Sequence, residues 1–311
     1  MSKKLAIYFS DPEPMGDPFN SEYPYWEIYQ EIVRGIEAHG IEVYIVRASY
    51  LGKGVFFDGW RIKNGVLVRV GQPIKVDLIW HRGSQATIPT NYDCPIINHP
   101  DMERLCGDKI KIAELFADIS PKTKAISSYR EFVDAVTEWG ISLEEKVVLK
   151  KNFLYGGQGV YIYPTKDITK SLYESWDNIL LQEFIDSSIG IPGIVEGLHD
   201  IRVTTINGEP VYTFVRIPKE GSFLANVAQG GKEMPLTLDK LPNDLLKLVE
   251  KINKKLIKYK PSILAADFVN SKEGFKLIEL NSRPGVCLPS LSPQDKNFND
   301  KIVELLVGEL S

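Results

Sequence analysis

The chain has 311 residues, of which 43% are hydrophobic and 25% are charged, a composition ordinary for a soluble globular protein with two or three subdomains. The net charge of −4 argues against a nucleic-acid-binding surface, and no apolar run is long enough to span a membrane. The N-terminal segment 1–14 has a basic start but only a short apolar run, so it predicts a strand and not a signal peptide. Three widely spaced cysteines fit no metal or disulfide pattern and favour a cytoplasmic location: Cys94, Cys106 and Cys287.

Strands and helices alternate in the first third of the chain. We predict strands at 3–10, 41–48, 76–83 and 94–100. A helix is predicted over 24–40, ending at Gly40, and a hairpin over 54–70 with its turn at Asn64-Gly65. This alternation predicts a parallel sheet covered by helices. The polar loop 10–23 follows the first strand, where open α/β sheets bind ligands, although an ordinary solvated loop remains an alternative.

The remaining two thirds change from mixed to antiparallel patterning. One helix is predicted over 101–119, a short strand after Pro121, a helix over 127–140, a strand–loop–strand over 145–164 and a strand over 178–185. From Asp200 onward the predicted elements are a hairpin over 199–218 with its turn at Asn207-Gly208, a helix over 241–260, and strands over 263–269 and 275–281. The fold class is therefore α/β, with an α+β C-terminal part.

Two carboxylates and an amide are predicted to converge on the last hairpin. Glu279 and Asn281 lie two residues apart near the end of a strand, so they point to the same face. A three-residue loop after Ser271 would place Asp267 directly opposite Glu279. Opposed carboxylates repel each other, and hard oxygen ligands of this kind suit Mg²⁺ or Mn²⁺. Arg283 as the counter-charge, or a charged strand end facing water, are the alternatives.

Phosphate-binding groups are the expected partners of such a metal site. The glycine-rich loop 155–160 can bring backbone N–H groups close to an anion, and Lys150 precedes it on a strand. The loop does not have the Walker sequence, so an ordinary β-turn that binds no phosphate is the alternative. Arg202, expected opposite about residue 213, and Arg216 lie near one edge of their hairpin. They suit a phosphate or a developing oxyanion, with two surface arginines as the alternative.

In this order the motifs resemble the ATP-grasp superfamily, most closely the branch of prokaryotic glutathione synthetase and the ribosomal-protein glutamate ligases. The resemblance spans about residues 101–290 and runs through "GDK", "VLKKNFLYGGQGV", "LQEFI", "DIRVTTINGEPVYTFVRIP", "NVAQGG", "ADFV" and "ELNSRPG". It implies three domains: a pre-ATP-grasp α/β substrate domain over 1–105, a small lid subdomain over 106–185, and a C-terminal subdomain with the metal site over 186–311.

The resemblance implies a role for each matching position. For ATP it implies that Lys109 and Lys150 bind the phosphates, and that a mobile lid over them is formed by Gly156, Gly157, Gln158 and Gly159. It implies a hinge whose backbone contacts adenine, formed by Gln182, Glu183, Phe184 and Ile185, and a ribose contact at Asp186. For two Mg²⁺ ions, or Mn²⁺, it implies the ligands Asp267, Glu279 and Asn281. For catalysis it implies arginines at the γ-phosphate and the acylphosphate oxyanion, Arg202 and Arg216, with Asn226 beside them.

The implied reaction is the ATP-dependent joining of a small-molecule carboxylate and an amine, amino-acid or peptide-like, through an acylphosphate. Relatives commonly form homo-oligomers. Arg283 stands where glutathione synthetases usually carry Ser or Thr, which argues against glutathione as the product; it could contact phosphate or hold a substrate carboxylate. An ATP-grasp kinase acting on a hydroxyl, a non-catalytic ATP-binding protein and a carboxylase subunit are the alternatives.

The sequence offers no obvious general base. His81, His99 and His199 lie outside the motifs, and we predict that they are structural. The His81-Arg82 pair, at the end of the fourth strand, is the exception, because Arg82 stands where it could bind a substrate carboxylate.

Overall fold

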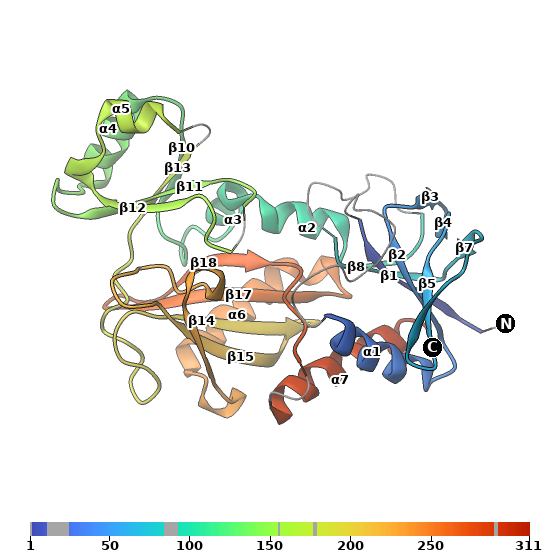
Figure 1. The fold of residues 1–311 in the computed structure, drawn as a ribbon. Helices are drawn as coiled ribbons and strands as arrows, with labels where there is room; N and C mark the ends of the chain where they lie inside the picture. The colour runs from blue at the N-terminus through green and yellow to red at the C-terminus, as the bar shows by residue number, and fades with distance from the viewer. Residues whose placement is uncertain (1, 11–24, 84–92, 155, 177–178, 289–291) are drawn as a thin grey trace.

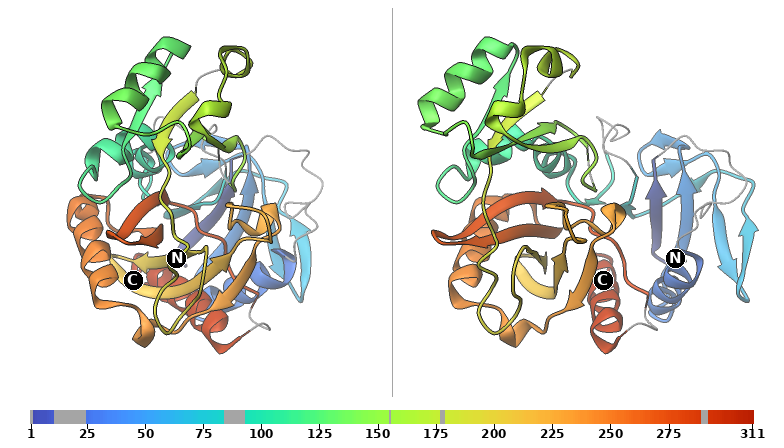
Figure 2. Two further views of the ribbon diagram at one scale, coloured as in Figure 1. Left: turned by 90° about the vertical axis from the view of Figure 1, so that its left-hand side faces the viewer. Right: turned by 60° about the vertical axis from the view of Figure 1, so that its left-hand side comes forward.

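The computed structural model describes residues 2–10, 25–83, 93–154, 156–176, 179–288 and 292–311. The chain forms three units, each built on its own main sheet (Figure 1). A small sheet with two helices stands over the C-terminal sheet, and the N-terminal sheet lies to one side of both (Figure 2). Nearly all of the predicted loop 10–23 lies outside the described residues.

The N-terminal unit is a six-stranded sheet with the order β6-β5-β2-β1-β8-β9. Its strands are β1 (Lys4–Phe9), β2 (Glu42–Arg47), β5 (Trp60–Lys63), β6 (Val66–Arg69), β8 (Leu78–His81) and β9 (Ile96–Ile97). A small second sheet contains β3 (Tyr50–Gly52), β4 (Val55–Phe56) and β7 (Ile74–Lys75). The predicted parallel arrangement of β1, β2, β8 and β9 is confirmed, as is the turn at Asn64-Gly65 between β5 and β6.

Helix α1 covers this sheet, and α7, from the other end of the chain, packs against α1. The buried stripe of α1 (Tyr25–Glu37) packs on β1 and β2, and α7 (Pro293–Gly308) joins the same apolar core. Figure 1 shows α7 beside α1. The N-terminal unit and the C-terminus of the chain are therefore one packed body.

The predicted helix over 101–119 is wrong, because the chain forms two helices there, α2 (Pro100–Gly107) and α3 (Lys109–Leu115). Asp108 separates them with an extended backbone, and its carboxylate caps α3 by accepting the Lys111 N–H at 3.3 Å. A side chain that satisfies the N–H groups of a new first turn favours a fresh helix start over continuation. The break places Lys109 at the first residue of α3.

The small unit is an antiparallel sheet of order β10-β13-β11-β12. Its elements are β10 (Thr123–Ile126), α4 (Tyr129–Trp139), β11 (Lys146–Lys151), β12 (Val160–Pro164), α5 (Lys170–Glu174) and β13 (Ile179–Glu183). Both helices share one apolar core with the sheet. The predicted strand–loop–strand over 145–164 is confirmed as the β11–β12 pair.

The C-terminal unit is an antiparallel sheet of order β16-β15-β14-β17-β18. Its elements are β14 (Asp200–Ile206), β15 (Glu209–Ile217), β16 (Lys232–Pro235), α6 (Asn243–Leu256), β17 (Ile263–Ser271) and β18 (Gly274–Asn281). Short 3-10 turns lie at Thr165–Asp167, Val227–Gln229, Leu238–Lys240 and Ile257–Tyr259. One sheet face packs on α2, α3 and α6. Alternation along the strands turns the other face toward the small unit.

Two β-bulges set the registers of the C-terminal sheet. In the β14–β15 hairpin a bulge at Thr204/Thr205 moves Arg202 opposite Phe214, one residue from the predicted 213. In the last hairpin Ser271 pairs with Gly274 across a two-residue turn, so the predicted three-residue loop is wrong. A bulge between Asp267 and Phe268 compensates for the shorter turn. Asp267 therefore lies opposite Glu279, as predicted.

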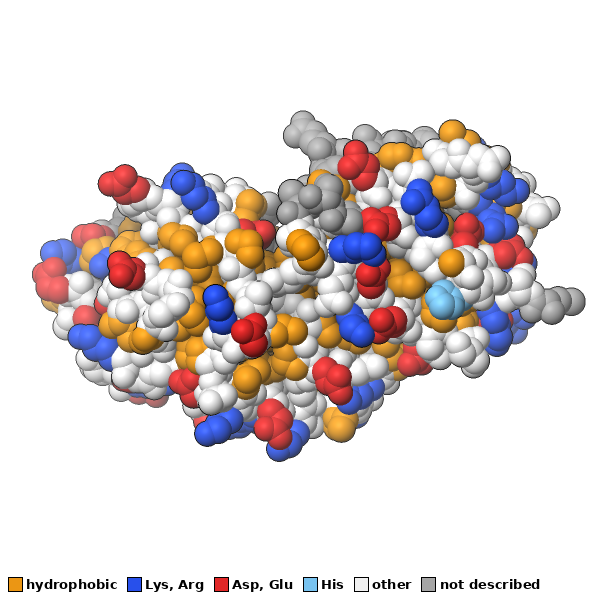
Figure 3. All heavy atoms as spheres, turned by 90° about the horizontal axis from the view of Figure 1, so that it is seen from below, with side chains coloured by type: hydrophobic (Ala, Val, Ile, Leu, Met, Phe, Trp, Pro, Cys, Tyr) orange, Lys and Arg blue, Asp and Glu red, His pale blue; other side chains and the backbone are white. Residues whose placement is uncertain are grey.

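The described surface is mixed in charge. On the face seen from below, acidic and basic side chains are interspersed (Figure 3). No helix among the described residues is long and apolar enough to cross a bilayer. All three cysteines are free thiols.

Candidate functional site

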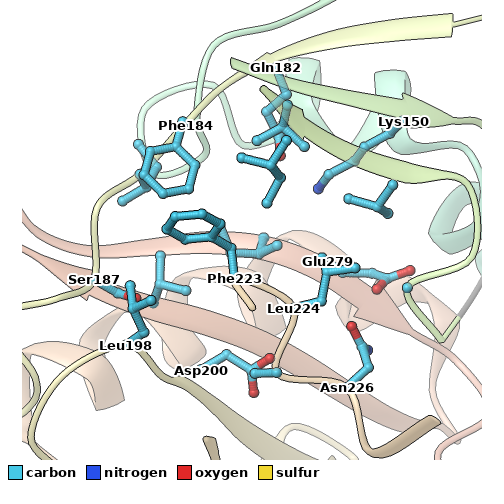
Figure 4. Close-up of a pocket in the computed structure, with 18 of the residues that line it drawn as sticks. Lys150, Gln182, Phe184, Ser187, Leu198, Asp200, Phe223, Leu224, Asn226 and Glu279 are labelled. Atoms are coloured by element: carbon cyan, nitrogen blue, oxygen red, sulfur yellow. The ribbon is translucent and has the colours of Figure 1, made fainter. Parts of the chain in front are cut away.

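A cleft lies between the small sheet and the open face of the C-terminal sheet. Its volume, with its open mouth, is about 890 Å³, within the size range of small-molecule sites. Figure 4 shows Lys150 and Gln182 on one side, with Glu279, Asp200 and Asn226 on the opposite side. Two sheets and one loop thus supply the polar groups of the cleft.

The structure brings together most of the residues predicted for a nucleotide. Those lining the cleft are Lys109, Lys150, Gly157, Gln158, Gln182, Glu183, Phe184, Ile185, Asn226 and Glu279. Those outside its lining are Gly156, Gly159, Asp186, Arg202, Arg216, Asp267 and Asn281. Among the second group, Asp186 accepts the Ser188 N–H at 2.9 Å, while the arginines and Asp267 form a buried cluster connected to the cleft through Asp200.

Two lysines approach the cleft from different elements. Lys150 is the penultimate residue of β11 and is buried, and this burial lowers its pKa to about 8. The Lys109 ammonium donates to the Leu154 carbonyl at 2.6 Å and lies 3.7 Å from Glu279 Oε1. Helix α3 and strand β11 therefore place the ammonium groups of Lys109 and Lys150 on the same cleft as the Glu279 carboxylate of β18.

The buried cluster is a chain of alternating charges on β14, β15 and β17. Arg202 donates to both oxygens of Asp267 at 2.6 Å each, and Arg216 donates to Asp267 at 2.8 Å. Arg216 also donates to Asp200 at 2.6 Å. Burial alone would raise the pKa of Asp267, but the two arginines hold it well below its usual range. Burial raises the pKa of Asp200 to about 6 against the pull of Arg216.

The residues predicted as metal ligands fit Mg²⁺ by their chemistry, but only with ligands from outside the protein. Among the described residues, no three His, Cys, Asp or Glu side chains are grouped so that they could hold an ion. Asp267 and Glu279 provide carboxylate oxygens, and Asn281 adds an amide oxygen that accepts the Arg283 N–H at 2.8 Å. Mg²⁺ is usually bound by one or two carboxylates plus substrate phosphates, so the donor types fit, and of the two carboxylates only Glu279 lines the cleft, because Asp267 is held by Arg202 and Arg216.

The glycine-rich loop reaches across the cleft. Gly156, Gly157 and Gly159 all have positive φ, which glycine adopts without strain. A Cβ on Gly157 would lie 2.9 Å from the Asn226 amide oxygen, and the Gln229 side chain donates to the Gly156 carbonyl at 3.3 Å. The loop thus packs against the 226–229 segment of the C-terminal unit.

An aromatic pair lies at one end of the cleft, formed by the predicted hinge residue Phe184 and by Phe223, which the sequence reasoning missed. Phe184 and Phe223 meet edge to face with ring centroids 5.4 Å apart (Figure 4). The Lys146 ammonium lies over both rings, 5.0 Å from Phe223 and 5.8 Å from Phe184. The one available signal was the position of Phe223 in the same short loop as Asn226. Val148, Ile162 and Ile278 add apolar lining.

His199 lines the cleft but is held by the backbone. Its Nδ1 faces the Gly197 carbonyl at 2.9 Å, and its other nitrogen accepts the Asn270 N–H at 3.2 Å. Burial lowers the pKa of this imidazole. The prediction of a structural role for His199 agrees with these contacts.

A model of the RimK-like ATP-grasp domain matches residues 106–306. The chain belongs to the RimK-like ATP-grasp family. A coenzyme gamma-F420-2:alpha-L-glutamate ligase of Methanocaldococcus jannaschii is 28% identical over 219 residues, 69% of this chain and 70% of that protein. A tetrahydromethanopterin:alpha-L-glutamate ligase of the same organism is 26% identical over 234 residues, 70% of this chain and 72% of that protein. A glutathione synthetase of Agrobacterium fabrum is 29% identical over 144 residues, 46% of this chain and 42% of that protein.

Solved structures show the same fold over the whole length. D-alanyl-alanine synthetase A of Vibrio cholerae superimposes with a TM-score of 0.66 at 14% identity, covering 99% of this chain and 98% of that one. D-alanine–D-alanine ligase of Bacillus anthracis, in complex with ATP, gives a TM-score of 0.61 at 14% identity, covering 99% and 97%. The resemblance to ATP-grasp carboxylate–amine ligases is confirmed, and the protein is an ATP-dependent carbon–nitrogen ligase. The family uses ATP, generally with Mg²⁺.

Proposed function

We propose that this ligase activates a small-molecule carboxylate as an acylphosphate and joins it to the amine of an amino acid or a peptide-like substrate. The observation that carries the proposal is the meeting of Lys109, Lys150 and Glu279 in one cleft. Phosphoryl transfer depends mainly on positioning and charge neutralisation, and these side chains supply the charges. We further propose that the chain divides into a substrate domain over 1–105, a lid over 106–185 and a metal-bearing subdomain over 186–311.

The nucleotide is proposed to lie along the cleft with its base at the aromatic end. The hinge 182–185 would contact adenine, and the loop 156–159 would cover the phosphates, which Lys109 and Lys150 neutralise. The support is that both lysines and most of the hinge and loop line one continuous space. Asp186 is the proposed ribose contact, although it lies outside the cleft lining and is bonded to Ser188.

The metal site is proposed to hold two Mg²⁺ ions through Asp267, Glu279 and Asn281, with phosphate oxygens completing the ligands. Bound Mg²⁺ would neutralise charge that develops on the transferred phosphoryl group. Arg202 and Arg216 would then stabilise the γ-phosphate and the acylphosphate oxyanion, with Asn226 next to them. Their fixed positions around Asp267 pre-organise them for this task.

Arg283 is proposed to hold a carboxylate of a substrate. Among the described residues, the buried Nη1 of Arg283 has no hydrogen-bond acceptor. Burying a guanidinium nitrogen without an acceptor is costly, so an anionic ligand is the simplest occupant of that position. Because the relatives reported above include glutamate ligases, L-glutamate is the first amine substrate to test.

The test is release of ADP and phosphate with Mg·ATP against amino acids and small peptides, offered singly and in pairs. Turnover that requires both a carboxylate and an amine, with one phosphate per ADP, supports the ligase. Turnover with a single alcohol and a stable phosphoester would instead assign a kinase. A protein that binds ATP but turns over nothing on the panel would contradict the proposed substrate class.

A further inference from the structure

A carboxylate on the edge strand β16 lies next to the buried charge cluster of the C-terminal sheet. Glu233 of β16 is opposite Arg216 of β15 in the antiparallel pairing. Its neighbour Met234 and Val215 of β15 pack into the core on the closed face of the sheet. Because side chains alternate along a strand, Glu233 and Arg216 both point to the open face. Among the described residues, the Glu233 side chain has no hydrogen bond or ion pair.

The strand register places Glu233 beyond the nucleotide cleft. Across β16, β15 and β14 the paired residues are Glu233, Arg216 and Asp200. Asp200 lines the cleft, and Glu233 lies on the other side of Arg216 from it. Arg216 donates to Asp200 and Asp267. The Glu233 carboxylate is therefore beside the arginine proposed for the acylphosphate, in the part of the open face that the nucleotide would leave free.

A tight turn connects Glu233 to the cleft. Asn226 lines the cleft, and its backbone carbonyl accepts the Gly231 N–H at 3.1 Å. A Cβ at Gly231 would lie 2.1 Å from the Ala225 carbonyl oxygen, so only glycine fits there. Strand β16 begins at the next residue, and Glu233 is its second residue. Asn226 and Glu233 thus lie at the two ends of one tightly packed turn.

The neighbouring carboxylates on this face already have cations. Asp200 and Asp267 each accept a hydrogen bond from Arg216, at 2.6 Å and 2.8 Å. Glu279 of β18 lies 3.7 Å from the Lys109 ammonium. These three carboxylates therefore balance charges of the protein itself, and the β16 carboxylate is left to balance the charge of a ligand.

Glu233 can be reached from solvent. It is classed as exposed, although partial burial raises the pKa of its carboxyl against the pull of Arg216 and Arg202. Asp295, at the start of α7, also raises the pKa of Glu233. The Asp295 carboxylate is buried and already accepts the Tyr212 hydroxyl at 2.6 Å. A cation arriving from solvent therefore meets Glu233 and not Asp295.

The proposed reaction needs an anion at this place. An amine substrate arrives largely as an ammonium ion at neutral pH. The arginines and lysines proposed to hold the phosphates repel such a cation at short range. A carboxylate that accepts hydrogen bonds from the ammonium offsets this repulsion and fixes the position of the nitrogen atom.

We propose that Glu233 binds the ammonium group of the incoming amine substrate, next to the acylphosphate at Arg216; the proposal rests on the ligase function above. The contact holds the amine on the side of Arg216 opposite the nucleotide. It also makes Glu233 a specificity residue, because it favours a nucleophile that is positively charged in solution over an uncharged one of similar size.

The experiment compares two nucleophiles on the acylphosphate: the substrate amine selected by the panel, and hydroxylamine, which is largely uncharged at neutral pH. Glu233→Gln keeps the side-chain size and removes the charge, and should raise KM for the amine by about 10-fold or more. KM for ATP and the rate of hydroxamate formation should stay within about threefold of wild type, as expected for an exposed side chain outside the nucleotide cleft. Glu233→Lys reverses the charge and should lower kcat/KM for the amine by about 100-fold or more, again with hydroxamate formation retained.

Glu209→Gln, at an exposed position at the start of β15, is the matched control and should change none of these constants. An unchanged KM for the amine in Glu233→Gln would overturn the proposal. Equal losses with the amine and with hydroxylamine would also overturn it, because they would place Glu233 in carboxylate activation or in packing. Wild-type protein that forms no hydroxamate with any panel carboxylate would contradict the ligase function itself, and the role of Glu233 would fall with it.

Discussion

Asp267 lies directly opposite Glu279, yet the two carboxylates are held by different cations. Asp267 is almost fully buried and receives Arg202 and Arg216, while Glu279 is 21% exposed and faces Lys109 at 3.7 Å. One carboxylate is therefore fixed in a buried ion network, and the other remains accessible from the cleft. A metal–nucleotide complex entering the cleft would meet Glu279 first.

Glu279→Gln should lower kcat by about 100-fold or more and weaken the dependence of the rate on Mg²⁺, since the proposed metal site would lose one charge at constant side-chain size. A Mg²⁺ titration of ADP release measures both effects. Glu273→Gln at the hairpin tip, where the side chain is 79% exposed, is the control and should behave like wild type. Full activity of Glu279→Gln would refute the metal assignment.

Arg216→Lys should keep the positive charge but lose the two-pronged contact with Asp200 and Asp267. We expect kcat to fall by about 100-fold, as for loss of an oxyanion-stabilising donor, with KM for ATP changed only a few-fold. Alanine is a poorer choice here, because an orphaned buried charge costs about 3–5 kcal/mol of folding free energy. Parallel losses in kcat and ATP affinity would leave Arg216 as a binding residue only.

The lowered pKa of Lys150 predicts that nucleotide binding depends on pH. Burial lowers its pKa to about 8, so the free protein loses this charge as the pH rises through about 8. Phosphate anions favour the charged form, so the Kd of Mg·ATP should rise above pH 8 and binding there should take up a proton. Calorimetry in buffers of different ionisation enthalpy measures that proton. Lys150→Arg should flatten the profile because arginine stays charged, while Lys151→Arg should leave it unchanged.

Phe223→Ala should raise KM for ATP by about fivefold to tenfold, corresponding to about 1–1.5 kcal/mol for a lost aromatic contact, with kcat within about twofold. The reason is that Phe223 completes the aromatic end of the cleft with Phe184. Steady-state kinetics in ATP measures the change. Phe57→Ala, at an exposed position of the N-terminal unit, is the control. An unchanged KM for ATP would contradict the proposal that the adenine base binds at this end of the cleft.

Local patterns predicted most strands of the main sheets and the pairing of Asp267 with Glu279, because side-chain alternation is a short-range property; the short strands β3, β7 and β16 were not predicted. The turn after Ser271 was assigned one residue too long, and a bulge offset that error. The helix break at Asp108 was missed because the apolar spacing continues across it, and only the capping carboxylate marks the new start. Helix α7 was not predicted at all.

The sequence patterns could not predict side-chain contacts between segments that are far apart in the chain. The pairing of Arg202 with Asp267 depends on β14 lying beside β17, although β15, β16 and α6 come between them in the chain. The arginines were assigned to a phosphate or a developing oxyanion, and their carboxylate partner was not foreseen. His81, which was singled out together with Arg82, links Ser10 and Glu103, and no local pattern brings these three segments together.

The most direct test of the account follows oxygen from the carboxylate substrate. Turnover with an ¹⁸O-labelled carboxylate and the amine should release phosphate that carries one ¹⁸O atom, because the acylphosphate keeps a carboxylate oxygen bonded to phosphorus. Mass spectrometry of the released phosphate reads this out. Phosphate without ¹⁸O would contradict the acylphosphate route.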